Sequence, residues 1–544
     1  MEDEFSIKDR RTYLMDMYPV WKKRTIYEMF QFIRRLYPKN PCFIQEKSYS
    51  YEMVGEEVDK TIQCLRAMNI CKGDRVIIAL ENSLEYVVLS YALAGMGAVK
   101  VPVNYKAGFS ELEYVIRQTN PVLIISDQSA LVKRTKRRFL KIHIIYLYDN
   151  WQSFLQLGDK DNEYDIADVD GDDVSDIIFT SGSIGNPKGA ILTHNMLLLS
   201  AYASCLNRAF YPGWIIYLPI PLFHVYGYVE GMLAALWVGG CIVTAKGRFD
   251  PDQALQLMDH NHVNDILCVP TILSSILQRE NLNKYNLKQL QAVYCSASIC
   301  PQWIWKAIRD RLQVNEITTG YGMTEVCGAT VQTDPGDQDE VLKTYLGKIL
   351  MINHGDEPEP IISYRVIDFE TGRILPTGVS GELICKGPVL MKNYIQDEMV
   401  HDLSFDDKGW FHTGDKGYFT EDGYLKLEGR VHDSYRINGE NVSLSFLDRV
   451  IAACPQVSMV ETVGIPDEKL GSVGVAFIEP TVYKEEVYSL IRQYCKRELA
   501  GFQVPRHYIF ESSENWPKTS TGKNIKKQLQ EIAIHKIHEN HSNT

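Results

Sequence analysis

One glycine-rich stretch restricts the fold of this chain more than any other feature of the sequence. Residues 176–179, Asp-Ile-Ile-Phe, have the apolar character of a short buried strand, and FTSGSIGNPKG at 179–189 continues from them. Glycines allow backbone N–H groups to turn toward an anion, while hydroxyl and ammonium groups add donors and positive charge. The sequence therefore predicts a strand that ends in a phosphate-binding loop. Its candidate ligands are Thr180, Ser181, Gly182, Ser183, Gly185 and Lys188.

This loop differs from the common nucleotide-binding loop, whose pattern ends in Gly-Lys-Ser or Gly-Lys-Thr. Here Lys188 follows Pro187 and precedes Gly189, so a different class of phosphate site is implied. Composition alone also fits a polar turn between two strands, which is the usual role of segments rich in Gly and Ser. The residues by themselves leave both interpretations open.

Length and charge limit the class of protein. A chain of 544 residues is too long for one hydrophobic core and predicts at least two domains. The net charge of −12 argues against a nucleic-acid-binding surface, although a local basic patch would be hidden in the total. The first residues lack the apolar core of a secretory signal, and the longest apolar run, 232–245, is too short to cross a bilayer. We expect a cytoplasmic protein without a transmembrane segment and without a nucleic-acid partner.

The pattern of strands and helices predicts an α/β fold. Short apolar strands alternate with helical segments, which is typical of layered, largely parallel sheets. The expected strands are 76–79, 122–125, 190–192, 266–269 and 292–294, and the expected helices are 1–41, 51–67, 83–96 and 193–205. From residue 361 the sequence predicts a smaller β-rich subdomain, and about 432–544 predicts a compact α+β unit. The twelve cysteines have no CxxC spacing, so we expect free thiols that are mostly buried.

The glycine-rich stretch closely resembles the TSG(S/T)TGxPKG signature of the adenylate-forming superfamily. This superfamily contains acyl-CoA synthetases, luciferases and the adenylation domains of peptide synthetases. Other family motifs follow in order, so that the resemblance covers nearly the whole chain. They are PIPLFHVYG at 219–227, TTGYGMTE at 318–325, GELICKGPVLMKNY at 381–394, WFHTGD at 410–415 and PKTSTGK at 517–523.

The resemblance implies a reaction in two halves. A carboxylate attacks the α-phosphorus of magnesium ATP to form an acyl-adenylate and pyrophosphate, and a thiol then displaces AMP from the acyl carbon. It also implies an adenylation domain at 1–431 and a mobile C-terminal domain at 432–544 that holds the catalytic lysine. Coenzyme A is the expected thiol, because NGEN at 438–441 and KRELAGFQVPR at 496–506 resemble the same segments of acyl-CoA ligases.

Most nucleotide ligands are implied by the motifs in the same way. Tyr321 would offer a flat face to adenine, and Asp415, predicted on a glycine turn, would accept the ribose hydroxyls. Glu325 is the predicted Mg²⁺ ligand, since Mg²⁺ takes few protein carboxylates and completes its shell with phosphate and water. Arg430 is expected near ribose and phosphate. The remaining predicted nucleotide contacts are Ser296, Ala297, Gly322, Met323 and Thr324.

The resemblance implies roles in the reaction for three further residues. Lys523 matches the catalytic lysine and would bridge the carboxylate and the α-phosphate, although most lysines in solvated loops are surface charges. His224 lies at the predicted mouth of the acyl pocket, as a gate or carboxylate contact, while a packed core histidine is the alternative. Gly439 would line the path of the pantetheine thiol.

Departures from the family motifs keep other functions open. Ile184 replaces the usual threonine of the phosphate loop, His432 the usual hinge residue, and Phe446 a common glutamate. A degenerate homologue that binds nucleotide without turnover is therefore one alternative. PLFHVYG has no aspartate to pair with the ammonium of an amino acid, so a fatty or aryl acid is expected. A ligase that loads the phosphopantetheine arm of an acyl carrier protein is the other alternative.

Overall fold

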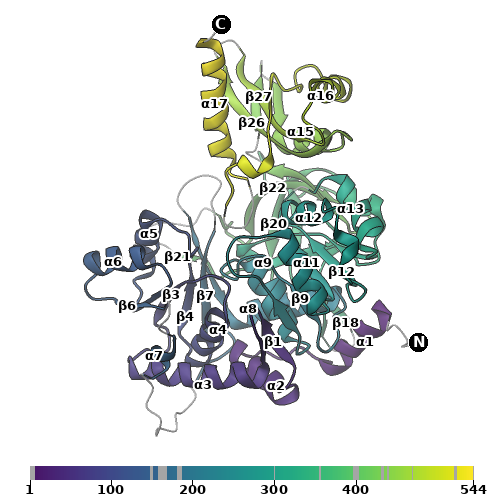
Figure 1. The fold of residues 1–544 in the computed structure, drawn as a ribbon. Coiled ribbons are helices and arrows are strands. Elements are labelled where there is room, and N and C mark those ends of the chain that lie inside the picture. Colours follow the sequence, from purple (N-terminus) through teal and green to yellow (C-terminus); the bar gives the residue numbers. More distant parts are fainter. Residues whose placement is uncertain are drawn as a thin grey trace.

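The computed structural model has a large body and a smaller C-terminal unit on one side of it (Figure 1). Within the described residues, no helix has the length and apolar character needed to cross a membrane. The structure describes residues 6–147, 151–156, 168–180, 187–298, 300–354, 357–395, 404–430, 434–437, 440–467, 470–519 and 524–542.

The first large sheet carries the predicted phosphate loop. Five of its seven strands pair in parallel, and β8 and β21 complete it through antiparallel pairs. Its order is β21 (Tyr394–Ile395), β8 (Gly189–Thr193), β7 (Val174–Phe179), β4 (Val99–Pro102), β3 (Arg75–Ala79), β5 (Leu123–Ser126) and β6 (His143–Tyr146). The strands expected at 76–79, 122–125 and 190–192 are confirmed within one residue or two at their ends.

The second large sheet is parallel except for its edge strand β2. Its order is β13 (Glu316–Thr318), β12 (Ala292–Cys295), β11 (Asp265–Cys268), β9 (Ile215–Tyr217), β10 (Cys241–Val243), β1 (Pro41–Ile44) and β2 (Ser48–Ser50). Loops that follow β12 and β13 leave from the carboxyl ends of the strands, where α/β sheets bind ligands. The loop after β12 contains the predicted nucleotide contacts Ser296 and Ala297, and β13 leads through Thr319 into strand β14 (Gly320–Met323), which contains Tyr321 and Gly322.

A buried helical layer separates the two sheets. Residues 86–96 of α4 (Leu84–Met96) and 197–206 of α8 (His194–Asn207) are buried on every side, as expected for helices enclosed by other elements. One core cluster joins them to Ile78 of β3 and Ile216 of β9. The outer faces are covered by α5 (Phe109–Thr119) on the first sheet and by α11 (Pro251–His260), α12 (Pro270–Leu277) and α13 (Gln302–Ala307) on the second. The predicted α/β fold class is confirmed.

The N-terminal region corrects one prediction. Residues 1–41 were expected to be helical throughout, but α1 (Ile7–Met17) and α2 (Ile26–Leu36) are separated by an extended segment that contains Pro19. Proline cannot continue a helix, and Thr25 starts the second helix with a capping box to Glu28. The helix expected at 51–67 is confirmed as α3 (Tyr51–Ala67).

Smaller antiparallel sheets follow the second large sheet, and they begin at residue 320, earlier than the β-rich subdomain predicted from residue 361. One contains β14 (Gly320–Met323), β15 (Gly328–Gln332) and β16 (Lys348–Ile349), and a hairpin is formed by β17 (Met351–His354) and β18 (Glu357–Pro360). The next contains β19 (Ser363–Ile367), β20 (Gly381–Lys386), β22 (Phe411–Phe419) and β23 (Leu425–Arg430). Asp415 therefore lies inside β22 and not on the expected turn, although Gly414 before it has a left-handed φ of +68°.

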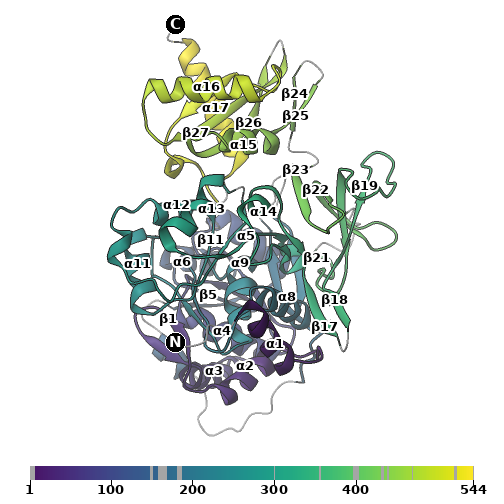
Figure 2. The same cartoon turned by 90° about the vertical axis from the view of Figure 1, so that its right-hand side faces the viewer.

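The C-terminal unit has a sheet and a hydrophobic core of its own. Its strands are β24 (Ser434–Ile437), β25 (Glu440–Ser443), β26 (Val457–Asp467), β27 (Gly471–Pro480) and β28 (His507–Phe510). Its helices are α15 (Leu444–Ala452), α16 (Glu485–Glu498) and α17 (Lys526–Ser542) (Figure 2). The predicted boundary between residues 431 and 432 falls outside the described residues and stays a prediction. All twelve cysteines are free, and ten of them are buried, as expected.

Candidate active site

The β7–β8 hairpin fixes both ends of the predicted phosphate loop. Phe179 pairs with Gly189, and the N–H of Thr180 donates to the carbonyl oxygen of Lys188 over 2.8 Å. The two strands expected on either side of the loop are confirmed. Residues 181–186 lie outside those described, so the positions of Ser181, Gly182, Ser183 and Gly185 stay predictions.

A chain of contacts joins this hairpin to the predicted magnesium ligand. The Nζ of Lys188 lies 4.7 Å from the ring centre of Tyr394, a favourable cation–π geometry. The Tyr394 hydroxyl donates to Oε1 of Glu325 over 2.5 Å. Three segments far apart in the sequence thus meet at one place, where a cation, a phenol and a carboxylate are held together.

Glu325 is also fixed through its backbone. It lies in a short 3₁₀ helix, Thr324–Val326, that directly follows β14, and its carbonyl oxygen accepts the N–H of Met391 over 2.7 Å. Thr324 is buried, whereas Glu325 and Met323 are only half-buried. The carboxylate is therefore held in place from two sides while part of it stays open to solvent.

Asp415 forms a second group of contacts with predicted ligands. Its Oδ2 accepts the hydroxyl of Tyr321 over 2.7 Å, and its Oδ1 lies 3.3 Å from Nε of Arg430. Burial, and next to it the charge of Asp415, raises the pKa of Tyr321 well above its usual value. The phenol thus stays a hydrogen-bond donor. Arg430 is the more exposed member of the pair, with 53% of its side chain exposed against 10% for Asp415.

Glycines of the TTGYGMTE motif have a packing role that the sequence did not reveal. Glycine has no Cβ, so Gly320 and Gly322 would allow the backbone to approach a ligand closely. A Cβ at Gly320 would lie 2.5 Å from the Val331 carbonyl oxygen, and one at Gly322 would lie 1.8 Å from the Gly328 carbonyl oxygen. Close pairing of β14 with β15 therefore explains both glycines without a ligand. Residues alone suggested a turn here, but Gly320–Met323 is a strand.

The loop after β12 is tied to the same region. The hydroxyl of Ser296 donates to the Gly320 carbonyl oxygen over 2.7 Å, which links the end of the second large sheet to β14. Ala297 follows with a φ of +76°, which is uncommon for a residue with a Cβ. Strained backbone of this kind is frequent at functional sites.

His224 has a structural role beside its predicted functional one. It is half-buried and caps the short helix Val225–Gly227, where its Nδ1 accepts the N–H of Tyr226 over 3.3 Å. This bond places the proton of the neutral ring on Nε2. Tyr226 itself is buried, and its hydroxyl donates to the carbonyl oxygen of Cys268 over 3.0 Å. The role of His224 at an acyl pocket stays a prediction.

The loop that contains Lys523 is fastened at its base. Lys518 and Asn524 form a β-bridge across it, and the N–H of Ile525 donates to the Pro517 carbonyl oxygen over 2.8 Å. Asn524 also donates to Glu461 of β26 over 2.8 Å. Lys523 itself, like Gly439 and His432, lies outside the described residues, so their roles stay predictions.

Sequence reasoning missed Tyr394 as a member of the site. GELICKGPVLMKNY at 381–394 was recognised as a family motif, but no chemistry was assigned to it. The structure shows that its last residue bonds Glu325 and that Met391, also in the motif, fixes the Glu325 backbone. The signal was the motif itself, whose partner in space is about 70 residues away in the sequence.

Family models match most of the chain. The model of the AMP-binding enzyme family matches residues 31–395, and that of the AMP-binding enzyme C-terminal domain matches residues 447–523. Among curated proteins, a putative acyl-CoA synthetase YngI of Bacillus subtilis is 28% identical over 89% of this chain and 92% of its own length. The acyl-CoA ligase sidI of Aspergillus fumigatus is 29% identical over 89% of this chain and 86% of its own.

Solved structures of this fold also match. The anthranilate CoA ligase AuaEII in complex with anthranoyl-AMP has a TM-score of 0.84 at 20% identity, over 95% of this chain and 98% of that chain. ATP-bound MatB of Rhodopseudomonas palustris has a TM-score of 0.80 at 25% identity, over 92% of this chain and 98% of that chain. The predicted superfamily and the predicted enzyme class, an AMP-forming acid–thiol ligase, are confirmed. The chain belongs to the AMP-binding enzyme family and has that family's C-terminal domain.

Proposed function

We propose that this chain activates a fatty or aryl acid with ATP as an acyl-adenylate and then transfers the acyl group to coenzyme A. The observation that carries the proposal is the contact chain from Lys188 through Tyr394 to Glu325. It brings the phosphate hairpin and the predicted metal ligand together, as a site for a nucleotide triphosphate requires. The Asp415 and Tyr321 pair supplies the ribose and adenine end.

The first half-reaction demands fixed positive charge, because an anionic carboxylate attacks a polyanion. Lys188 at the end of the phosphate loop would pair with the β- and γ-phosphates, together with Thr180. Lys523 would bridge the attacking carboxylate and the α-phosphate, where negative charge increases in the transition state. Arg430, which is exposed and already close to Asp415, would reach the ribose and the α-phosphate.

Residues at the site fit the Mg²⁺ that the family implies. Among the described residues, no cluster of three or more His, Cys, Asp or Glu side chains could hold a metal alone. Mg²⁺ needs no such cluster, since phosphate oxygens and water complete its shell. Glu325, oriented by Tyr394, is the single carboxylate we assign to it. The ion supplies charge screening for the phosphates, and the Tyr394 bond keeps the carboxylate aimed.

Entry of the thiol requires the C-terminal unit to change position, because Lys523 would occupy the approach to the acyl carbon. A separate core and a base-fastened loop suit a unit that moves as a body. Gly439 would then line the path of the pantetheine thiol. His224 would contact the acid or gate its pocket, with Nε2 as the donor.

The acceptor and the acid are assigned to classes only. Coenzyme A is favoured by the relatives named as acyl-CoA ligases, and a carrier-protein arm remains the alternative acceptor. An apolar acid is favoured because PLFHVYG lacks a carboxylate that could pair with an ammonium. The alternative to an enzyme is a degenerate homologue that binds nucleotide without turnover. The cytoplasmic location expected from the sequence stays a prediction.

Acid-dependent exchange of labelled pyrophosphate into ATP tests the proposal directly. We would measure it over a panel of fatty, aryl and amino acids, followed by thioester formation with coenzyme A and with a phosphopantetheinylated carrier. Exchange with an apolar acid and transfer to coenzyme A are expected. Transfer to the carrier alone would select the first alternative. Binding of ATP without exchange for any acid would select the degenerate homologue.

A further inference from the structure

One surface segment has a charge opposite to that of the chain as a whole. Residues 133–141, which we call the basic ridge, contain six Lys or Arg and no acidic residue, while the chain has a net charge of −12. They form the last two turns of α6 (Ser129–Arg138) and the turn after it. In Figure 1, α6 lies at the left edge of the molecule, beside β6, which is the outermost strand of the first sheet.

Helical spacing places every cation of the basic ridge on the outside. Val132 and Thr135 are buried and Phe139 is half-buried, so this face packs on the protein, whereas the six cations are exposed. Two of the six have partners: Arg138 lies 3.5 Å from Glu113, and Arg134 covers the ring of Phe109. Among the described residues, neither an ion pair nor a ring contact is found for the other four cations, which are Lys133, Lys136, Arg137 and Lys141.

An exposed aliphatic side chain lies among these cations. Leu140 is 88% exposed, the highest value among the large apolar residues described. It borders a surface pocket of about 460 Å³ that Phe139, Ile116 and Ile142 also line, with Arg117, Asn120 and Lys141 at the same site. A protruding leucine beside unpaired positive charge is not explained by packing within the chain.

We propose that the basic ridge docks this protein on anionic lipid bilayers. Cations near such a surface are attracted to the negatively charged headgroups, and an exposed apolar side chain can enter the boundary with the acyl chains. A nucleic acid would use the cations but would gain nothing from an aliphatic leucine. Binding of single strands also needs exposed aromatic faces, and Phe139 is half-buried.

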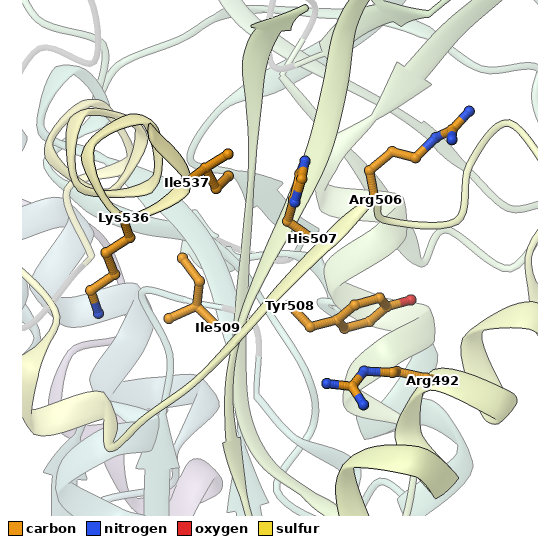
Figure 3. A pocket seen from close by; sticks show the side chains of 7 residues that line it. All are labelled: Arg492, Arg506, His507, Tyr508, Ile509, Lys536 and Ile537. Carbon is orange, nitrogen blue, oxygen red and sulfur yellow. The ribbon is translucent and has the colours of Figure 1, made fainter. Parts of the chain in front are cut away.

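A second basic surface, on the C-terminal unit, differs from the basic ridge because two of its cations form ion pairs. Figure 3 shows Arg492 and Tyr508 on one side of this pocket and Lys536 of α17 on the other. Here Arg492 lies 2.8 Å from Glu485, and Lys536 lies 2.6 Å from Glu511. Carboxylates offset these cations, which is not the case for the four unpaired cations of the basic ridge.

The position of the basic ridge leaves the active site free. Residues 139–142 come just before β6, so Leu140 lies at the amino ends of the parallel strands. Thr180 follows β7 at the carboxyl end of the same sheet. Docking therefore does not cover the nucleotide site. If the proposed function also holds, acids that partition into a bilayer would be concentrated near the enzyme, but docking itself needs no substrate.

Vesicle sedimentation with the full chain tests the proposal. Wild type is expected to bind vesicles of phosphatidylcholine with phosphatidylglycerol at low salt, and to be released at high salt. The triple variant Lys136→Gln, Arg137→Gln, Lys141→Gln should bind on the order of 100-fold more weakly, at about fivefold per cation. Leu140→Ser, which removes no charge, should also weaken binding. The matched control changes exposed lysines of the other half of the body: Lys246→Gln, Lys284→Gln and Lys288→Gln.

Four outcomes would overturn the proposal. They are no binding of wild type to anionic vesicles, equal loss in the control triple variant, unchanged binding of Leu140→Ser, and tighter binding of a single-stranded oligonucleotide than of vesicles at the same salt. The last outcome would assign the basic ridge to nucleic acid. None of these measurements involves ATP or an acid, so failure of docking is distinct from failure of the proposed ligase activity.

Discussion

The predicted nucleotide site of the large body and the contacts between the body and the C-terminal unit are built in different ways. In the body, the predicted ligands Glu325 and Asp415 each accept a hydrogen bond from a side chain, Tyr394 and Tyr321 respectively. Between the two units, Ser445, Arg449 and Trp303 each donate to a backbone carbonyl oxygen of the other unit. A backbone carbonyl oxygen can also accept from water or from another donor, so these side-chain donors are replaceable.

The difference indicates how one site can serve two half-reactions. Specific carboxylate contacts orient the predicted ligands Glu325 and Asp415, and if these bind the nucleotide as proposed, this half need not reorganise during the reaction. The loop that contains Lys523 is fastened at its base by the bridge of Lys518 to Asn524, and it belongs to a unit that contacts the body through backbone carbonyl oxygens. This arrangement fits the proposed movement of the C-terminal unit between the two half-reactions.

The largest effect is expected for a substitution in the C-terminal unit that should impair one half-reaction and not the other. Lys523→Ala should lower the rate of adenylate formation by about 10² to 10³, because one preorganised charge contact with the transition state is lost. Thioester formation from supplied acyl-adenylate should be largely kept. Single-turnover assays of each half-reaction measure both, with the exposed Lys527→Ala as the matched control. Equal loss in both half-reactions would contradict a role limited to the first.

The sequence predicted features that depend on neighbouring residues better than features that depend on contacts between distant segments. Alternating strands and helices are local patterns, so α3 and the central strands of both sheets were predicted nearly to the residue. Motif resemblance located Asp415 and Glu325. The bond from Tyr394 to Glu325 could not be predicted, since it depends on how β21 joins the edge of the first sheet.

Local patterns also failed where tertiary structure decides. The motif around Gly414 has the composition of a turn, yet pairing with β20 and β23 extends it into β22. The packing role of Gly320 and Gly322 follows from the close approach of β15, which is a contact between strands and not a pattern within one. The sequence of each segment allowed more than one local conformation, and pairing with neighbouring strands determined which one forms.

Acid should weaken the large body through His194, which begins α8 directly after the phosphate hairpin. Burial lowers its pKa from 6.5 to about 4. Between these values the unfolded chain binds a proton that the folded chain does not, so stability falls as the pH falls. The full loss is about 3 kcal/mol, at 1.36 kcal/mol per pH unit.

Thermal unfolding at pH 7 and pH 5 tests this expectation. The decrease in unfolding midpoint should be smaller in His194→Gln than in wild type, because the variant has no imidazole to titrate. Exposed His260→Gln, at the end of α11, is the control and should decrease like wild type. An equal pH dependence of wild type and His194→Gln would show that the buried histidine is not the cause.

Tyr394→Phe tests the side-chain bonds of the body. Loss of the hydroxyl leaves Glu325 without its orienting donor, and a hydrogen bond to a charged group contributes about 1.5–3 kcal/mol. Adenylate formation at limiting Mg²⁺ should fall roughly 10- to 100-fold, while saturating Mg²⁺ should restore part of it. Tyr424→Phe removes a similar bond, to Asp337 at 3.0 Å, away from the predicted ligands and should change neither value. An Mg²⁺ dependence like that of wild type would exclude the orienting role.

Ile184→Thr would sharpen the comparison by adding a donor to the body without changing the C-terminal unit. Family members usually have threonine at this position of the phosphate loop, and a hydroxyl that bonds a charged phosphate contributes about 1.5 kcal/mol or more. The Kd for ATP should therefore decrease about tenfold, as measured by calorimetric titration.

Ile184→Val is the matched control, because valine has the shape of threonine without its hydroxyl. Thioester formation from supplied acyl-adenylate should be the same in both variants, since it uses no β- or γ-phosphate. If threonine and valine gave the same Kd, the missing hydroxyl would not be what distinguishes this loop, and the phosphates would depend on backbone N–H groups and Lys188 instead.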